Sequence, residues 1–298
     1  MLRLNKSGNV MTIQIRSMKA EDVETCGRIC YEAFKGIAEG HNFRPDFPTA
    51  QAGIDLLRML FESPYSFSAV AERDGVVLGS NHLVEYDAIR AVGPITVDPA
   101  AQAKGAGRML MEAVIERGKG SAGIRLVQDA FNIASLSLYA SLGFDVKEPL
   151  ALIEGELKGD LPPDVTVRAI EEQDYEACAG LCRKTHGFDR LNELKHMLPF
   201  LTSFVAIRDG RLTAYTSAPH FYPLNHAVAE TEEDMQLLLT GTGNLSQGRP
   251  LSFLLPTRQT SLLRWCLKQG MRVMKPLTLM AMGEYHEPRG CYLPSVGY

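Results

Sequence analysis

The sequence predicts a mixed α/β protein made of two tandem domains that share one fold. The chain has 298 residues, 45% of them hydrophobic, which is enough for two ordinary domains that each bury a core. Segments of the first half reappear in the same order in the second half. Strand, hairpin and helix patterns alternate within each half, which is typical of an α/β or α+β domain with a mixed sheet.

Three pairs of segments define the repeat. IRSMKAEDVETCGRIC (15–30) matches VRAIEEQDYEACAGLC (167–182), AVAERDG (69–75) matches FVAIRDG (204–210), and SLYASLGF (137–144) weakly matches LRWCLKQGM (263–271). In each copy we therefore expect a strand, a helix with two cysteines, a hairpin at Asp-Gly, and a central strand. A helix, a strand, a helix ending at glycine, and closing strands should follow.

The boundary between the copies is predicted near Gly155–Asp164, where Gly, Asp and a Pro pair interrupt the pattern. We expect an N-terminal domain over 12–158 and a C-terminal domain over 159–298. The polar, Gly-containing residues 1–11 are predicted to be a disordered leader.

Composition restricts the classes of function. The net charge is −4, with no dense basic stripe, so a nucleic-acid partner is not expected. No apolar run reaches the ~18 residues of a membrane span, and the N-terminus lacks the apolar core of a signal peptide, so we expect a cytoplasmic protein without a membrane partner. Six sparsely spaced cysteines are read as reduced thiols. Each cysteine-bearing helix offers only two of the four ligands that zinc needs, so core packing is expected and no metal is predicted.

The segment ITVDPAAQAKGAGRMLMEAV (95–114) is a strand, a break at Asp-Pro, a turn with two glycines, and a helix. The first turn of a helix has unsatisfied N–H groups, and glycines let an anion approach them, so this pattern suits phosphate. It is neither a nucleotide-hydrolase loop nor the dinucleotide fingerprint, whose third glycine would fall on Leu110. A plain strand-to-helix turn is the alternative.

Two signatures make the assignment more specific. Q-x-x-G-x-G at 102–107 resembles the pyrophosphate motif of the GNAT superfamily of N-acetyltransferases, and N-x-x-[AS]-x-x-x-Y at 132–139, followed by LGF at 142–144, resembles its second motif. The resemblance covers residues 12–155, and two-copy proteins also occur in the superfamily. It implies two tandem GNAT-like folds, each a mixed, mostly antiparallel sheet flanked by helices, with acetyl-CoA as co-substrate.

The resemblance also implies roles for particular residues. The main chain of 95–97 would pair with pantetheine, amides of 103–108 would hold the pyrophosphate, and Asn132 would hold the pantetheine arm or order a water. Tyr139 would protonate the leaving thiolate, unless it is only a core tyrosine on an amphipathic helix. The implied binding residues are Ile95, Thr96, Val97, Gln102, Ala103, Lys104, Gly105, Ala106, Gly107, Arg108, Asn132, Ser135 and Tyr139.

The motifs do not identify the base that deprotonates the amine. In NHLVEYD (81–87), Glu85 is our first candidate, as base or water relay, followed by His82 and Asp87. Each of them is alternatively a solvated residue at a strand end. His41 lies in a Pro- and aromatic-rich segment that would suit a loop on the substrate side.

The second copy has lost the glycine turn. HAVAETEEDMQLLL (226–239) stands there instead, and its carboxylates suit a helix N-terminus but would repel pyrophosphate. Cys266 occupies the position of Tyr139, and Gln259 that of Asn132. Gly241–Asn244 is predicted to be a helix-terminating loop. We therefore expect a degenerate copy without a CoA site, which completes the acceptor pocket or covers the sheet of the first copy.

These observations predict an N-acetyltransferase that moves acetyl from acetyl-CoA directly to a primary amine of a small molecule or peptide. The rival interpretation is a non-catalytic CoA-sensing or partner-binding protein that keeps the fold. A third possibility is that both copies bind CoA. Monomer and homodimer both remain open, because two fused copies can replace a dimer.

Overall fold

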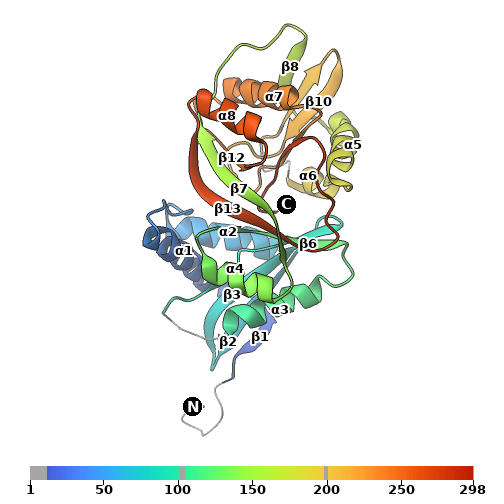
Figure 1. Cartoon of the computed structure of the whole chain (residues 1–298). Helices are drawn as coiled ribbons and strands as arrows, with labels where there is room; N and C mark the ends of the chain where they lie inside the picture. The colour runs from blue at the N-terminus through green and yellow to red at the C-terminus, as the bar shows by residue number, and fades with distance from the viewer. Residues whose placement is uncertain (1–11, 101–104, 198–200, 298) are drawn as a thin grey trace. The chain divides into compact units, whose positions relative to one another are not determined.

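The computed structural model describes residues 12–100, 105–197 and 201–297, which form two compact units (Figure 1). The first unit holds the residues up to Glu85 together with Arg90–Ile124, and the second holds Tyr86–Ile89 and Arg125–Tyr298. These units are defined by spatial contacts, and their limits differ from those of the predicted domains, 12–158 and 159–298. The predicted domain limits stay a prediction. The predicted leader, 1–11, lies outside the described residues.

The first unit contains one sheet and its helices. Its elements are β1 (Gln14–Ser17), the 3-10 turn η1 (Ala20–Asp22), α1 (Val23–Gly40), α2 (Ala50–Glu62), β2 (Ser66–Arg73), β3 (Val76–Val84), β4 (Ile89–Val92, from Arg90 onward), β5 (Thr96–Val97) and α3 (Ala106–Arg117). β1, β2 and β3 pair antiparallel in that order, and β4 and β5 both pair with β3. The chain bends between β4 and β5 at Gly93, whose φ of 124° suits glycine.

Alternate residues of β2 face two different layers of helices. Val70 packs with Cys26, Cys30 and Leu57 from α1 and α2. Its neighbours Ala69 and Ala71 pack instead with Ala106 and Leu110 of α3. Because successive side chains of a strand point to opposite faces, α3 covers one face of this sheet, and α1 with α2 covers the other.

The second unit contains two sheets. Its elements are β6 (Gly123–Asp129, from Arg125 onward), α4 (Ile133–Ser141), β7 (Asp145–Gly155), β8 (Val165–Ala169), η2 (Glu172–Asp174), α5 (Tyr175–His186), α6 (Leu191–Met197), β9 (Phe204–Arg208), β10 (Arg211–Thr216), β11 (Ala227–Ala229), α7 (Glu232–Leu245), β12 (Leu251–Pro256), α8 (Thr260–Lys268), β13 (Arg272–Gly283) and β14 (Cys291–Leu293). The strand orders are β6-β13-β7-β12 and β14-β11-β10-β9-β8.

The five-stranded sheet repeats the layering of the first unit. Val205, Tyr215 and Val228 pack with the cysteines of α5. Ala206 and Ala214, which point to the other face, pack with the buried residues of α7. Helices therefore cover both faces of this sheet, as they do in the first unit.

The start of each copy is held by the same ion pair. Arg16 Nη1 lies 2.6 Å from Asp22 Oδ2, and Arg168 Nη1 lies 2.6 Å from Asp174 Oδ2. In both copies the same carboxylate also accepts a main-chain N–H from the residue three positions earlier, at 2.8 Å. This agreement confirms that the segments are two copies of one fold.

Both predicted hairpins are confirmed. Asp74-Gly75 joins β2 to β3, with φ of 52° and 77°, and Asp209-Gly210 joins β9 to β10, with φ of 49° and 75°. Two consecutive positive φ values are typical of the type I′ turn that suits the twist of a hairpin.

The predicted loop at Gly241–Asn244 is wrong, because α7 continues through it to Leu245. A Cβ on Gly241 would lie 2.3 Å from Cγ2 of Val167, and one on Gly243 would lie 2.2 Å from the carbonyl oxygen of Leu157. These glycines therefore let the helix pack closely against its neighbours. Close approach, rather than helix termination, explains them.

A strand of the second copy joins a strand of the first. β13 pairs antiparallel with β7, from Arg272 opposite Glu154 to Ala281 opposite Asp145, and β12 pairs with the other edge of β7. No local pattern in the sequence predicts this pairing. It explains why the second compact unit begins within β6 rather than at the predicted boundary.

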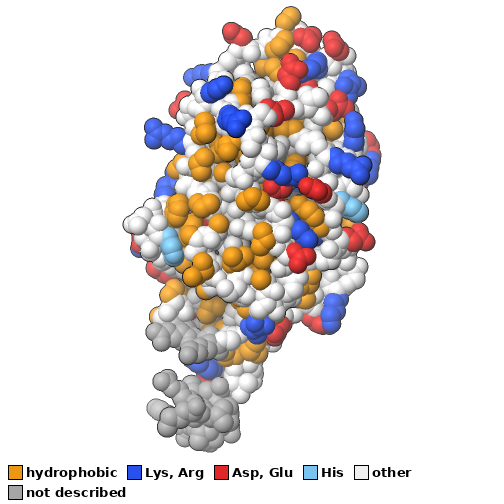
Figure 2. Space-filling model, viewed as in Figure 1, with side chains coloured by type: hydrophobic (Ala, Val, Ile, Leu, Met, Phe, Trp, Pro, Cys, Tyr) orange, Lys and Arg blue, Asp and Glu red, His pale blue; other side chains and the backbone are white. Residues whose placement is uncertain are grey.

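All six cysteines are buried free thiols. Among the described residues, none of the helices is long and apolar enough to cross a bilayer. Basic and acidic side chains are interspersed over the face drawn in Figure 2.

Candidate active site

The helix α3 begins at a glycine that leaves its first turn uncapped. Gly105 is the N-cap, with φ of 102° and no side-chain hydrogen bond to the helix. A Cβ at this position would meet no described atom within 4 Å. The first N–H groups of a helix have no partner within the helix, and with a glycine cap they remain available to an anion. Gln102, Ala103 and Lys104, which belong to the same motif, lie outside the described residues.

The rest of the turn continues into α3. Ala106 is fully buried, Gly107 occupies the second helical position, and Arg108 follows it. The Arg108 side chain is 45% exposed, and its Nη1 lies 3.9 Å from Glu112 Oε1. An exposed guanidinium in the first turn of the helix would add a cation to the positive end of the helix dipole.

β5 is held against β3 by close main-chain approach. Thr96 lies opposite Ser80 and Val97 opposite Gly79, and Asp98 N donates to Leu78 O at 2.8 Å. A Cβ on Gly79 would lie 2.2 Å from Thr96 O, so only glycine permits this pairing. Ile95 precedes the strand and packs on the core below α3.

The second motif forms the start of α4, in the second unit. Asn132 is the N-cap, and its Oδ1 accepts the N–H of Ser135 at 3.2 Å. Asn132, which is predicted to hold pantetheine, therefore caps a helix in this structure. Its Oδ1 is used by the cap, so its side-chain amide nitrogen would be the atom that donates a hydrogen bond to a ligand. Ser135 and Tyr139 lie four residues apart on α4, on one face of the helix.

Tyr139 is a buried phenol. Its side chain is 6% exposed and packs edge-on against Phe144, with ring centroids 6.4 Å apart. Burial raises the pKa of Tyr139, and a hydrogen bond with Ser135 partly opposes this. The phenol is therefore protonated at neutral pH, as a general acid must be before it acts.

Glu85, the first candidate for the base, forms an ion pair. Its carboxylate accepts Nε of Arg117 at 3.1 Å and Nη2 at 2.9 Å. The Glu85 side chain is 16% exposed, whereas that of Arg117 is 53% exposed. This fork-like pairing fixes the carboxylate in one orientation, which favours a positioning role. Its predicted role as a base stays a prediction.

The other candidates for the base have structural partners. His82 is fully buried, its Nδ1 lies 2.8 Å from Ser68 Oγ, and burial lowers its pKa to about 3. Asp87 accepts the N–H groups of Asn192 and Glu193, both at 3.1 Å, at the start of α6. The exposed His41 ends α1, with Nδ1 2.9 Å from Ile37 O.

In the second copy, the chain itself closes the corresponding helix start. α7 begins at Thr231, whose Oγ1 accepts the N–H of Asp234 at 3.1 Å. Asp234 is buried and lies 3.0 Å from Arg208 Nη2. Glu230 lies 2.6 Å from Arg211 Nη1. A hydroxyl cap and paired carboxylates leave this helix start unsuited to an anion.

The chain's own last strand also occupies the edge of β11 in the second copy. β14 pairs antiparallel with β11, with Val228 opposite Tyr292. Gln259, at the position that matches Asn132, donates from Nε2 to Tyr292 O at 2.6 Å. Cys266, at the position that matches Tyr139, is fully buried, and burial raises the pKa of its thiol to about 12. The edge of β11 is therefore occupied by a strand of the chain itself.

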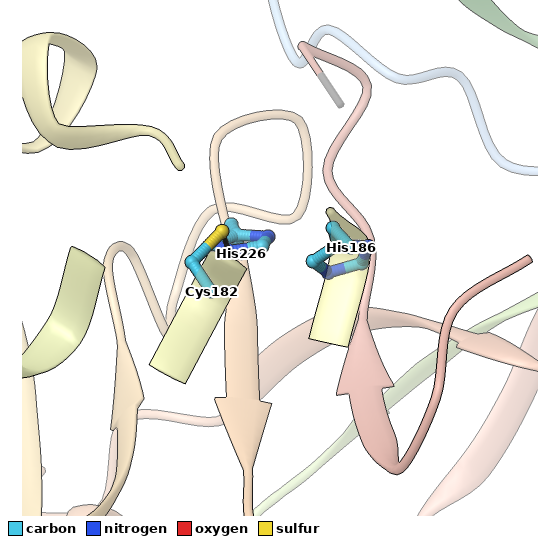
Figure 3. A group of neighbouring side chains, drawn as sticks. All are labelled: Cys182, His186 and His226. Atoms are coloured by element: carbon cyan, nitrogen blue, oxygen red, sulfur yellow. Dashed lines mark hydrogen bonds between the residues drawn. The ribbon is translucent and has the colours of Figure 1, made fainter. Parts of the chain in front are cut away.

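Sequence reasoning missed one buried group of chemically capable side chains. Cys182, His186 and His226 lie together in the second unit (Figure 3). The four-residue spacing of Cys182 and His186 was a signal for the first two of them. His226 lies 44 residues from Cys182, and nothing local links them.

The family comparison agrees with the motifs. Residues 34–144 match the model of the acetyltransferase (GNAT) family, whose general chemistry is acyl transfer from coenzyme A. No curated protein sequence matches the chain significantly. The match spans α2 to α4 and so includes both motifs.

Solved structures share the fold over nearly the whole chain. A candidate acetyltransferase from Pyrococcus horikoshii has a TM-score of 0.71 at 15% identity, covering 96% of this chain and 95% of that one. A GCN5-related N-acetyltransferase from Sphaerobacter thermophilus has a TM-score of 0.59 at 15% identity, with 97% and 98% covered. A tandem GNAT protein from the clavulanic acid biosynthesis pathway has 0.59 at 13%, with 91% and 98% covered. Residues 34–144 are therefore similar to the GNAT acetyltransferase family, and the chain has the fold of a tandem GNAT protein.

Proposed function

We propose that the N-terminal copy transfers acetyl from acetyl-CoA directly to a primary amine of a small molecule or peptide, and that the C-terminal copy does not bind CoA. The observation that carries this proposal is the contrast between two helix starts. α3 begins at Gly105 without a side-chain cap, whereas α7 begins at a Thr231 cap with paired carboxylates around it. Only the first of these suits a pyrophosphate.

The donor site follows from the main chain. Amides from Gly105 to Arg108 would bind the pyrophosphate, with Arg108 and Lys104 as cations for the phosphates. The main chain of Ile95 to Val97 would pair with the peptide-like pantetheine. Asn132 and Ser135 would contact its far end.

The reaction needs little covalent chemistry from the protein. The amine nitrogen attacks the thioester carbonyl carbon, the C–S bond breaks, and Tyr139 gives its proton to the leaving thiolate. A main-chain N–H near Val97 would polarise the carbonyl, and holding the two reactants in attack geometry would supply much of the rate. The proton of the amine goes to a base, for which Glu85 or a water that it orients is our candidate.

An amine panel tests the proposal. The full-length protein is mixed with acetyl-CoA and with simple amines, polyamines, aminoglycosides, amino acids or peptides with free N-termini. Release of CoA is followed with a thiol reagent, and the product is identified by mass. We expect at least one class of amine to accelerate CoA release and to gain one acetyl group.

The rival interpretation predicts a different outcome. If acetyl-CoA binds but no amine in the panel is acetylated, a CoA-sensing protein becomes the better interpretation. If acetyl-CoA does not bind at all, the assignment of the α3 turn is wrong.

A further inference from the structure

Three potential metal ligands meet in the interior of the second unit. α5 places Cys182 and His186 one turn apart on the same face, and His226 immediately precedes β11, a strand against which α5 packs. One ligand atom from each residue lies within 4.8 Å of the others. The three side chains are at most 4% exposed. Figure 3 shows Cys182 and His226 side by side with His186 next to them.

The donor atoms suit a zinc ion in both type and spacing. Thiolate sulfur and imidazole nitrogen are both zinc ligands, with Zn–S of about 2.3 Å and Zn–N of about 2.0–2.1 Å. For tetrahedral geometry those bonds place sulfur and nitrogen about 3.6 Å apart. Cys182 Sγ and His226 Nε2 are 3.8 Å apart. This distance is close to the zinc-bound value, and the donor atom of His186 lies within 4.8 Å of both.

The first copy provides an internal comparison. Cys30 is the counterpart of Cys182, and Phe34 stands where the second copy has His186. Phe34 packs edge-on against Phe47, with centroids 5.5 Å apart, in an apolar cluster. The fold therefore needs no histidine at this position.

Next to His226 there is room for a water as a fourth ligand. A cavity of about 20 Å³ adjoins this residue, lined in part by Tyr215, His226, Ser203 and Ser217, and this is enough room for one water. Tyr215 Oη lies 2.9 Å from His226 Nε2. The buried Arg190 next to the cavity is ion-paired with Glu193, so the pair adds no net charge beside the cluster.

We propose that Cys182, His186 and His226 bind one Zn²⁺ ion, with a water in the adjoining cavity as the fourth ligand. Binding forms Zn–S and two Zn–N bonds and releases the Cys182 proton to solvent. Three protein ligands and one water give the coordination of an open zinc site, here buried in the second copy.

Metal analysis of the full chain tests this proposal. The protein is incubated with Zn²⁺, separated from free ion by gel filtration, and analysed for zinc per chain. We expect one ion per chain in the wild type and at least a tenfold lower content in Cys182→Ala and His186→Phe. His186→Phe installs the residue of the first copy, so the fold has a precedent for it. Cys30→Ala, the matched control in the first copy, should keep one ion.

The absorption spectrum of the cobalt-loaded protein is a second measurement, and it reports the metal–thiolate bond directly and not the folding of the chain. Wild-type protein loaded with Co²⁺ should show the charge-transfer absorption of a cobalt–thiolate bond, and Cys182→Ala should not. Wild-type protein that retains no zinc, or His186→Phe that retains a full ion, would overturn the proposal. Acetyl-CoA binding measured on the same samples keeps this result separate from the proposed function.

Discussion

Tyr139 is the residue on which the proposed chemistry depends most. Its phenol is buried and protonated at neutral pH, and it lies on α4 four residues after Ser135. We predict that Tyr139→Phe lowers kcat for amine acetylation about 10²-fold, within the range of a lost general acid, with little change in KM for acetyl-CoA. Steady-state kinetics measures this.

Tyr175→Phe is the matched control for Tyr139→Phe. Tyr175 begins α5, in the second copy, away from both motifs. It should leave kcat unchanged. An undiminished kcat in Tyr139→Phe would leave Tyr139 as a core residue and would remove only the general-acid role.

His82 links stability to pH. Its folded pKa is about 3, because burial penalises the charged imidazole, whereas an unfolded histidine titrates near 6.5. Below pH 6.5 the unfolded chain binds a proton that the folded chain does not, so stability falls as pH drops. We predict that at pH 5 His82 costs about 2 kcal/mol relative to pH 7.

Urea unfolding at several pH values checks the His82 prediction. His82→Gln should show a shallower loss of stability than the wild type between pH 6.5 and 5, whatever its stability at pH 7. Parallel pH profiles for the two proteins would show that His82 is protonated in the folded state.

Among the elements, α3 offers the clearest test of the phosphate site. Gly107→Glu puts a carboxylate in the first turn, where α7 has Glu233. We predict about a tenfold loss of acetyl-CoA affinity, because the new charge repels the pyrophosphate. Calorimetry measures it. Ala113→Glu adds the same charge two turns later and should have a much smaller effect; equal losses in the two variants would point to general charge repulsion.

The ion pair at the start of each copy is a second test at the scale of elements. Hydrogen bonding to Arg16 lowers the pKa of Asp22, and hydrogen bonding to Arg168 lowers that of Asp174. We predict that Asp22→Asn and Asp174→Asn each cost about 1–3 kcal/mol at pH 7, since both remove a charged hydrogen bond. Denaturant unfolding measures this cost.

The pH dependence of these variants has a definite sign. The carboxylate stabilises the fold above its unfolded pKa, and this contribution is lost as pH falls through the lower folded pKa. The gap between the wild type and each variant should therefore shrink below about pH 4. Glu39→Gln removes an exposed ion pair with Lys35 and should cost less than either of these substitutions. A similar cost for all three variants would contradict the role of Asp22 and Asp174.

For the whole molecule, sequence reasoning succeeded where the signal is local. The hairpins at Asp74-Gly75 and Asp209-Gly210 are set within a few residues, and the structure has both. The glycine turn was recognisable for the same reason. Its assignment to pyrophosphate rests on the spacing of the glutamine and the two glycines in the motif at 102–107.

The features that sequence reasoning missed all depend on distant segments. The pairing of β13 with β7, and of β14 with β11, joins strands with no shared local signal. The helix through Gly241–Asn244 is permitted by close packing on Val167 and Leu157, which composition does not reveal. His226 joins Cys182 and His186 only in the folded chain.

The central claim for the whole molecule is that one of two similar copies binds CoA. Native mass spectrometry of the full chain at saturating acetyl-CoA tests it most directly. We predict one acetyl-CoA per chain for the wild type and a clear loss of that ligand for Gly107→Glu at the same concentration. Two ligands per chain, or one ligand that persists unchanged in Gly107→Glu, would contradict the account.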